Sequence, residues 1–140
     1  MGEHDRAVAD FNRAIELRPD YAEAYGNRGG AYLEKGEYDR AIADFNRLIK
    51  LRANCAEAFA YRGTAYLRKA DYARAIDDFN RVIKLNPDCA EAHFHKAVAC
   101  DAVRQTSEAL AEYEKFLEYA PSGDDDNIRH ARQRIKEVLG

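Results

Sequence analysis

The stretch from Ala22 to Cys55, AEAYGNRGGAYLEKGEYDRAIADFNRLIKLRANC, decides the fold because the chain repeats it. Ala56 to Cys89 reads AEAFAYRGTAYLRKADYARAIDDFNRVIKLNPDC, with 21 of 34 positions identical. Residues 90–122 form a more divergent third copy, and residues 2–21 match the second half of a copy. A fixed period of this length is typical of proteins built from stacked structural repeats.

Two apolar stripes with helical spacing run through each copy. The first stripe lies before Gly36 and the second after it, so the pattern predicts two helices joined by a short turn. An isolated hairpin cannot bury both stripes, and we therefore expect neighbouring copies to stack. In the first copy the stripes are Tyr25, Gly29 and Tyr32, followed by Tyr38, Ala41, Ile42, Phe45 and Ile49.

Residues 123–140 differ from the repeats and predict a single capping helix. Asp124, Asp125 and Asp126 are good N-cap residues, and their charge suits a helix N-terminus. One apolar stripe follows, with polar residues around it, as expected of a helix that closes an open array. The stripe consists of Ile128, Ala131, Ile135 and Val138 or Leu139.

Composition narrows the possible partners and location. The 140 residues include 22 basic and 25 acidic side chains, and the isoelectric point is near 5.8, which argues against nucleic-acid binding. No run of 18 apolar residues predicts a membrane span, and no secretory signal follows Met1. Three cysteines, an odd number, favour reduced thiols. We expect a soluble cytoplasmic protein, unless the chain is a fragment that has lost a targeting segment.

The repeated positions resemble the tetratricopeptide repeat family. This resemblance implies an all-α fold, a right-handed superhelix of helix-turn-helix units, within one domain spanning residues 1–140. It assigns residues 2–21 to the second helix of a partial repeat, residues 22–55, 56–89 and 90–122 to three full repeats, and residues 123–140 to the cap. The matching residues are Tyr25, Gly29, Tyr32, Ala41, Phe45 and Leu48 in the first copy and Phe59, Gly63, Tyr66, Ala75, Phe79, Val82 and Pro87 in the second.

The match is weaker at two places. In the third copy His93, Ala97 and Cys100 replace the aromatic residue, the glycine and the tyrosine of the first helix. In the first copy Ala53 stands where the proline is usual.

A glycine inside a helix costs about 1 kcal/mol relative to alanine. Gly29 and Gly63 therefore predict helices that cross too closely for a side chain.

A basic residue recurs on the apolar face of each first helix, with an acid 16 residues later. We expect each pair to meet within its hairpin, with the stem of the basic residue packed and its head bound to the acid. The alternative is that the head reaches the acid of the preceding hairpin, which is Asp10 for Arg28. The three pairs are Arg28 and Asp44, Arg62 and Asp78, and Lys96 and Glu112.

The sequence does not predict an enzyme, a cofactor site or a metal site. No glycine-rich phosphate loop, paired CxxC spacing or nucleophile with a neighbouring base is present. The best metal candidate combines Cys89, His93, His95 and Cys100. Because His93 and His95 are two residues apart, they point to different faces of a helix. His93 and Cys100 also fall on expected core positions, so we predict no metal.

Family resemblance places a binding groove on the concave side of the first helices. It implies a protein or peptide partner, held by exposed residues that include Tyr61 and Phe94. The alternative is that these residues merely face solvent. The predicted groove residues are Asn27, Tyr61, Thr64, Arg68, Phe94 and His95.

Charged positions along this groove bear on which partner it binds. Glu23, Glu57 and Glu91 form an acidic ladder that could select a basic ligand, although a first-turn glutamate also suits the helix dipole. The family's best-defined ligand is the C-terminal carboxylate of heat-shock chaperones, which needs cations. Here Asn27 matches, but Glu57 and Tyr61 stand at the cationic positions, so we do not expect this ligand.

The N-terminal edge and the possible truncation leave two further hypotheses. Residues 4–17 carry an apolar face whose usual first-helix partner is missing, which indicates an exposed patch. Self-association through Phe11 and Ile15 would make the protein a structural assembly unit. Alternatively, the chain is a regulatory arm of a larger enzyme.

Overall fold

The computed structural model describes residues 2–140, which contain eight α-helices and no strand. The chain divides into two compact units, Met1–Asp71 and Tyr72–Gly140, and the boundary falls inside the second repeat. The predicted all-α hairpin pattern is confirmed. The first unit holds α1 (Glu3–Leu17), α2 (Ala22–Glu34), α3 (Tyr38–Leu51) and α4 (Ala56–Arg68), and the second holds α5 (Tyr72–Leu85), α6 (Ala90–Ala102), α7 (Thr106–Tyr119) and α8 (Asp126–Leu139).

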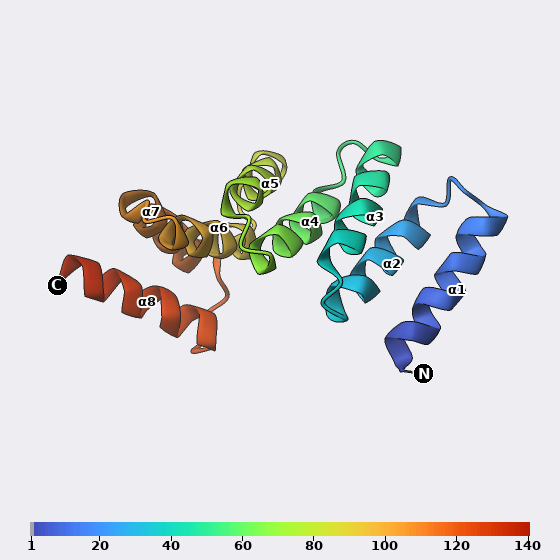
Figure 1. The fold of residues 1–140 in the computed structure, drawn as a ribbon. Coiled ribbons are helices and arrows are strands. Elements are labelled where there is room, and N and C mark those ends of the chain that lie inside the picture. Colours follow the sequence, from blue (N-terminus) through green and yellow to red (C-terminus); the bar gives the residue numbers. More distant parts are fainter. Residues whose placement is uncertain (1) are drawn as a thin grey trace. The chain divides into compact units, whose positions relative to one another are not determined.

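In the first unit, α2 and α3 form an antiparallel hairpin, with α1 packed on α2 and α4 packed on α3 (Figure 1). Phe45 and Ala41 of α3 are completely buried, and Ala65 of α4 joins the same core cluster. A lysine at the end of each first helix bonds an aspartate of the preceding second helix, Lys35 to Asp5 and Lys69 to Asp39. Buried apolar contacts in the core and ion pairs at the surface therefore both hold neighbouring repeats together.

The turn between α2 and α3 requires a left-handed residue. Gly36 has φ of +78°, and the amide of Glu37 donates to the carbonyl of Tyr32 at 2.9 Å. This bond from the residue after Gly36 back to the last turn of α2 is the Schellman closure, in which glycine is favoured. The following copies place Ala70 (φ +64°) and Arg104 (φ +63°) at the equivalent position.

The close helix crossing predicted for Gly29 is confirmed. A Cβ atom added there would lie 2.7 Å from Cε1 of Phe45, well inside van der Waals contact. Glycine therefore lets the aromatic ring of α3 approach the backbone of α2.

The predicted pairing of Arg28 with Asp44 is also confirmed. The guanidinium donates Nε to Oδ2 at 2.8 Å and Nη2 to Oδ1 at 2.6 Å, and this bonding raises the pKa of Arg28. The alternative partner, Asp10, is therefore wrong for Arg28. Nη1 instead donates to Oδ1 of Asn12 at 2.9 Å, and the equivalent bond joins Arg62 to Asn46. Asn12 lies two residues further along α1 than Asp10, and it is the residue that a guanidinium anchored on Asp44 reaches.

In the second unit, α6 and α7 form the best-packed hairpin, with α5 against α6 and α8 against α7. The predicted pair of Lys96 and Glu112 is confirmed, with Nζ 3.0 Å from Oε1. His93, expected in the core, is buried, and its Nδ1 and Nε2 lie 2.6 Å from Glu112 Oε2 and 2.7 Å from the Pro87 carbonyl. Burial raises the pKa of Glu112, but the bonds from His93 and Lys96 outweigh it and leave the pKa below its ordinary value.

The predicted capping helix is α8. Asp125 is its N-cap and accepts a hydrogen bond from the amide of Ile128 at 2.8 Å. Ile128 and Ala131 are buried and Ile135 is half-buried, whereas Val138 and Leu139 are exposed. The apolar stripe therefore packs along the first three turns and ends before the last one.

Candidate functional site

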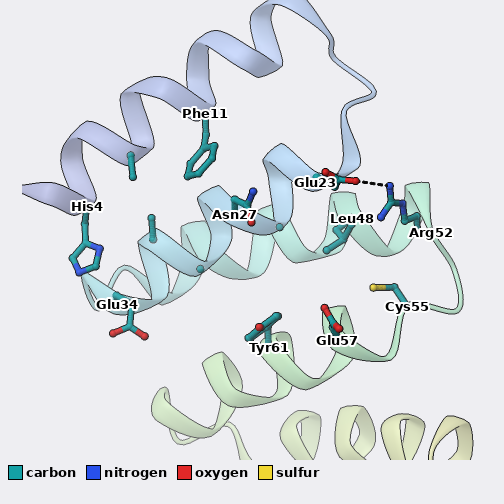
Figure 2. Close-up of a pocket in the computed structure, with 14 residues that line it drawn as sticks. His4, Phe11, Glu23, Asn27, Glu34, Leu48, Arg52, Cys55, Glu57 and Tyr61 are labelled. Atoms are coloured by element: carbon teal, nitrogen blue, oxygen red, sulfur yellow. Dashed lines mark ion pairs between the residues drawn. The ribbon is translucent and has the colours of Figure 1, made fainter.

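A pocket of about 620 Å³ opens on the first unit and involves all four of its helices (Figure 2). Helix α2 forms its floor, α1 one wall, and α4 with the end of α3 the opposite wall. The lining residues are His4, Ala7, Phe11, Glu23, Gly26, Asn27, Gly30, Ala31, Glu34, Leu48, Arg52, Cys55, Glu57 and Tyr61.

Small residues at helical spacing open the floor of the pocket. Gly26 and Gly30 lie one turn apart on α2, and Asn27 beside them is exposed. A Cβ added to Gly30 would meet no atom within 4 Å, whereas one on Gly26 would lie 3.1 Å from Leu48 Cδ2. The backbone of α2 is therefore accessible at Gly30, and Asn27 offers both a hydrogen-bond donor and an acceptor.

Tyr61 forms the aromatic part of the α4 wall. Its side chain is 48% exposed, while its ring stacks on the buried Phe45 at a centroid distance of 5.7 Å. Phe45 thus fixes the orientation of Tyr61 and leaves one ring face and the hydroxyl accessible. On the opposite wall, Phe11 is half-buried and points from α1 toward α2 (Figure 2).

The charged lining of the pocket is acidic. The lining contains one arginine, Arg52, and three glutamates, Glu23, Glu34 and Glu57. With His4 neutral, its formal charge is −2. Arg52 Nη2 lies 3.5 Å from Glu23 Oε1, so this glutamate is already paired. Glu34 and Glu57 are exposed, and no side chain of residues 2–140 forms an ion pair with either. The uncompensated negative charge comes from these two carboxylates.

Of the predicted groove residues, the structure brings Asn27 and Tyr61 together in this pocket. Thr64 and Arg68 also lie on α4 but are not part of the lining. The Thr64 hydroxyl donates to the carbonyl of Ala60 at 2.9 Å, and Arg68 is exposed near the end of the helix.

The predicted exposure of Phe94 is wrong. Phe94 is only 8% exposed because it packs in the core of the second unit, against the rings of Phe116 at 5.0 Å and His130 of α8 at 5.9 Å. The capping helix covers this position in the last repeat. His95 remains half-buried on α6, with its ring centroid 5.5 Å from that of Phe79.

Sequence reasoning missed the contributions of α1 and α3 to the pocket. Phe11 was expected at an assembly edge, and Ala7 on the same face, but neither was expected in the groove. Nothing in the sequence indicated that the pocket would also be lined by Leu48, Arg52 and Cys55. The useful signal was the apolar face of residues 4–17, which contributes Ala7 and Phe11 to the pocket.

The remaining candidates from the sequence form no site in the described part of the chain. Residues 2–140 contain no group of three or more histidine, cysteine or acidic side chains arranged to hold a metal ion. Cys55, Cys89 and Cys100 are all unpaired, and burial raises the pKa of the Cys100 thiol. No described helix combines the length and the apolar character needed to cross a membrane.

Comparisons with known proteins agree with the repeat pattern. The tetratricopeptide repeat family model matches residues 1–58 and 62–125. The crystal structure of MamA is 25% identical and has a TM-score of 0.89, with 99% of this chain and 78% of that chain covered. No curated protein sequence gives a significant match.

Two domains of RPAP3 share the fold. The first domain of RPAP3 (Spaghetti), bound to the HSP90 peptide SRMEEVD, is 24% identical with a TM-score of 0.78, covering 85% of this chain and 94% of that chain. The second domain of human RPAP3, in complex with the HSP70 peptide SGPTIEEVD, is 24% identical with a TM-score of 0.74, covering 85% of this chain and 95% of that chain. At this identity the likeness concerns the fold alone.

Proposed function

Because the chain belongs to the tetratricopeptide repeat family, we propose that it is a non-enzymatic interaction module that binds a peptide segment or partner helix in the pocket on α2. The observation that carries this proposal is the pairing of Asn27 with an oriented, exposed Tyr61 in one pocket. Tyrosine is enriched at protein interfaces because it offers a large ring and a polar tip. Asn27 can hydrogen-bond a peptide backbone.

The charge of the pocket favours a ligand with lysine or arginine. Glu34 lies at the C-terminal end of the floor helix α2 and Glu57 in the first turn of α4, and a cationic side chain beside either carboxylate would gain charge-assisted hydrogen bonds. The RPAP3 domains bind peptides that end in EEVD. Such a ligand would place carboxylates beside Glu57, where like charges repel. We therefore propose selectivity for basic over acidic peptides.

A pair of matched peptides tests this proposal. Fluorescent peptides of alternating alanine and lysine, or alanine and glutamate, differ only in the sign of their charge. The protein should bind the lysine peptide more tightly in fluorescence anisotropy. The Glu34→Lys/Glu57→Lys variant should reverse the order, whereas Glu16→Lys/Glu118→Lys, with exposed charges outside the pocket, should not. Equal binding of both peptides by both variants would contradict the proposal.

Self-association at the N-terminal edge is the second candidate function. It is favoured by one observation, that Phe11 of α1 is only half-buried whereas its counterpart in α3, Phe45, is completely buried. Ile15 of the same face is also half-buried. If two copies meet there, light scattering should show a mass that rises with concentration, and Phe11→Glu should abolish the rise. A constant monomer mass up to high micromolar concentration would exclude this function.

A reducing cytoplasmic location is part of the same proposal. It is supported by three cysteines that remain unpaired in a chain of this size.

A further inference from the structure

The negative charge of the pocket is divided between its two ends. Two glutamates, Glu23 and Glu57, and one arginine, Arg52, stand at one end, which leaves a net charge of −1 there. Because the Arg52 guanidinium already pairs with Glu23, this charge belongs to Glu57. At the other end Glu34 lies in the last turn of α2. With His4 neutral, each end therefore carries one exposed carboxylate that forms no ion pair within residues 2–140.

The middle of the pocket is neutral. All other lining residues are small, apolar or polar, and none of them is charged. Asn27 offers a hydrogen-bond donor and an acceptor, and Tyr61 offers an exposed ring and a hydroxyl. A ligand that complements this pocket carries a positive group at each end of an uncharged stretch.

The two free carboxylates are far apart. Helices α2, α3 and α4 alternate in direction, so the first turn of α4, with Glu57, lies at the same end as the first turn of α2, with Glu23 (Figure 2). Glu34 follows Glu23 by eleven residues, which is about 16 Å along the helix. Neighbouring helices lie about 8–10 Å apart, so roughly 19 Å separates Glu34 from Glu57.

This separation selects a spacing in the ligand. An extended chain rises about 3.3 Å per residue, so two side chains six residues apart stand about 20 Å apart and point to the same side of the chain. Two adjacent lysines stand only about 3.3 Å apart. They could reach both carboxylates only with both stems stretched in opposite directions, which costs side-chain entropy.

The position of Asn27 favours an extended ligand over a helix. Asn27 lies on α2 between the end with Glu23 and the end with Glu34. An extended chain leaves backbone N–H and C=O groups free to bond its side-chain amide, whereas a helix uses these groups within itself.

We infer, in an extension that rests on the proposed function, that the ligand is an extended segment with two basic residues six positions apart and uncharged residues between them. One basic residue pairs with Glu57 and the other with Glu34, and Asn27 bonds the backbone between them.

Two peptides of equal composition test this spacing. Both are fluorescent, capped decamers of alanine and serine with two lysines, placed at positions 2 and 8 in the spaced peptide and at positions 5 and 6 in the adjacent peptide. In fluorescence anisotropy the spaced peptide should bind about three- to fivefold more tightly, the contribution of one further exposed ion pair. Glu34→Gln and Glu57→Gln should each abolish this advantage.

Matched controls lie on the second unit. Glu91 is exposed in the first turn of α6, as Glu57 is in α4, and Glu118 is exposed in the last turn of α7, as Glu34 is in α2. Glu91→Gln and Glu118→Gln should therefore leave the advantage of the spaced peptide unchanged.

Single lysine replacements show whether each carboxylate has its own partner. In wild type, alanine at either lysine of the spaced peptide should weaken binding by about three- to fivefold. In Glu57→Gln one of these replacements should have no effect, and in Glu34→Gln only the other should have none. Equal effects of both replacements in both variants would overturn the inference.

The outcomes separate this inference from the proposed function. Equal binding of the spaced and adjacent peptides, with both still preferred over glutamate peptides, would overturn the spacing and leave the basic selectivity standing. No binding of any lysine peptide would overturn both. Tighter binding of a helical alanine peptide with lysines eleven residues apart would make the occupant a helix and contradict the extended ligand.

Discussion

The ring of Tyr61 lies on the ring of Phe45, with centroids 5.7 Å apart and planes 19° from parallel. Phe45 belongs to α3 and is completely buried, whereas Tyr61 belongs to α4 and is exposed to the pocket. The stacking therefore links the core of the first unit to its candidate binding surface. It orients Tyr61 before any ligand arrives, which reduces the entropy cost of binding.

Replacement of Tyr61 tests this link. We expect Tyr61→Ala to weaken binding of the lysine peptide by about tenfold, since truncation of an interface tyrosine commonly costs more than 1 kcal/mol. Tyr61→Phe keeps the stacked ring and should lose less than half of that free energy. Calorimetric titration of both variants measures the difference. Identical affinities for Tyr61→Ala and wild type would remove Tyr61 from the site.

Arg28 is predicted to stabilise the fold rather than bind a ligand. Arg28→Leu leaves the buried carboxylate of Asp44 without its partner, so the free energy of unfolding should fall by about 1–3 kcal/mol. Arg28→Leu/Asp44→Leu removes both charges and should recover at least half of the loss, because an apolar pair is often as stable as a buried ion pair. Urea denaturation measures both values. Unchanged stability of Arg28→Leu would show that the pair contributes nothing.

The turns after α4 and α6 offer a stabilising change. Ala70 and Arg104 adopt the left-handed conformation that Gly36 occupies in the first copy. This conformation costs a residue with a side chain roughly 1–2 kcal/mol. Replacement by glycine removes this cost, but the greater conformational entropy of glycine in the unfolded chain offsets part of the stabilisation. Ala70→Gly should therefore raise the free energy of unfolding by about 0.5–1 kcal/mol. Gly36→Ala is the matched control and should lower stability by a similar amount in thermal denaturation.

Stability should depend on pH through Asp101. Bonds from Arg134, at 2.9 Å and 3.0 Å, hold the pKa of Asp101 below its ordinary value. A carboxylate whose pKa is lower in the folded protein contributes fully above its unfolded pKa of about 3.9. The contribution is lost as the pH falls through the lower folded value.

Comparison of wild type with Asp101→Asn isolates this effect. The wild-type advantage in free energy of unfolding should be constant between pH 5 and pH 7 and should shrink below about pH 4. Because Asp101 of α6 binds Arg134 of α8, the protection factors of α8 amides, which correct hydrogen exchange for its intrinsic pH dependence, should fall over the same pH range. A constant difference down to pH 2 would contradict this assignment.

The repeat period predicted the hairpins, the close approach at Gly29 and the Arg28–Asp44 pair because each depends on contacts that recur in every copy. Phe94 was misjudged because the last repeat is covered by α8, which is not a copy of the repeat. The pocket was only half predicted for a related reason. Asn27 and Tyr61 follow from the family pattern, but the wall containing Phe11 comes from α1, which the family's groove positions on the first helices do not include.

The most direct test of the central proposal is amide chemical-shift mapping of the ¹⁵N-labelled protein during titration with the alanine–lysine peptide. The largest shifts are expected at Asn27, Gly30 and Tyr61, on the floor and wall of the pocket, and they should be absent with the alanine–glutamate peptide. Shifts confined to α5–α8, or no shifts at millimolar peptide, would contradict the assignment of this pocket as the binding site.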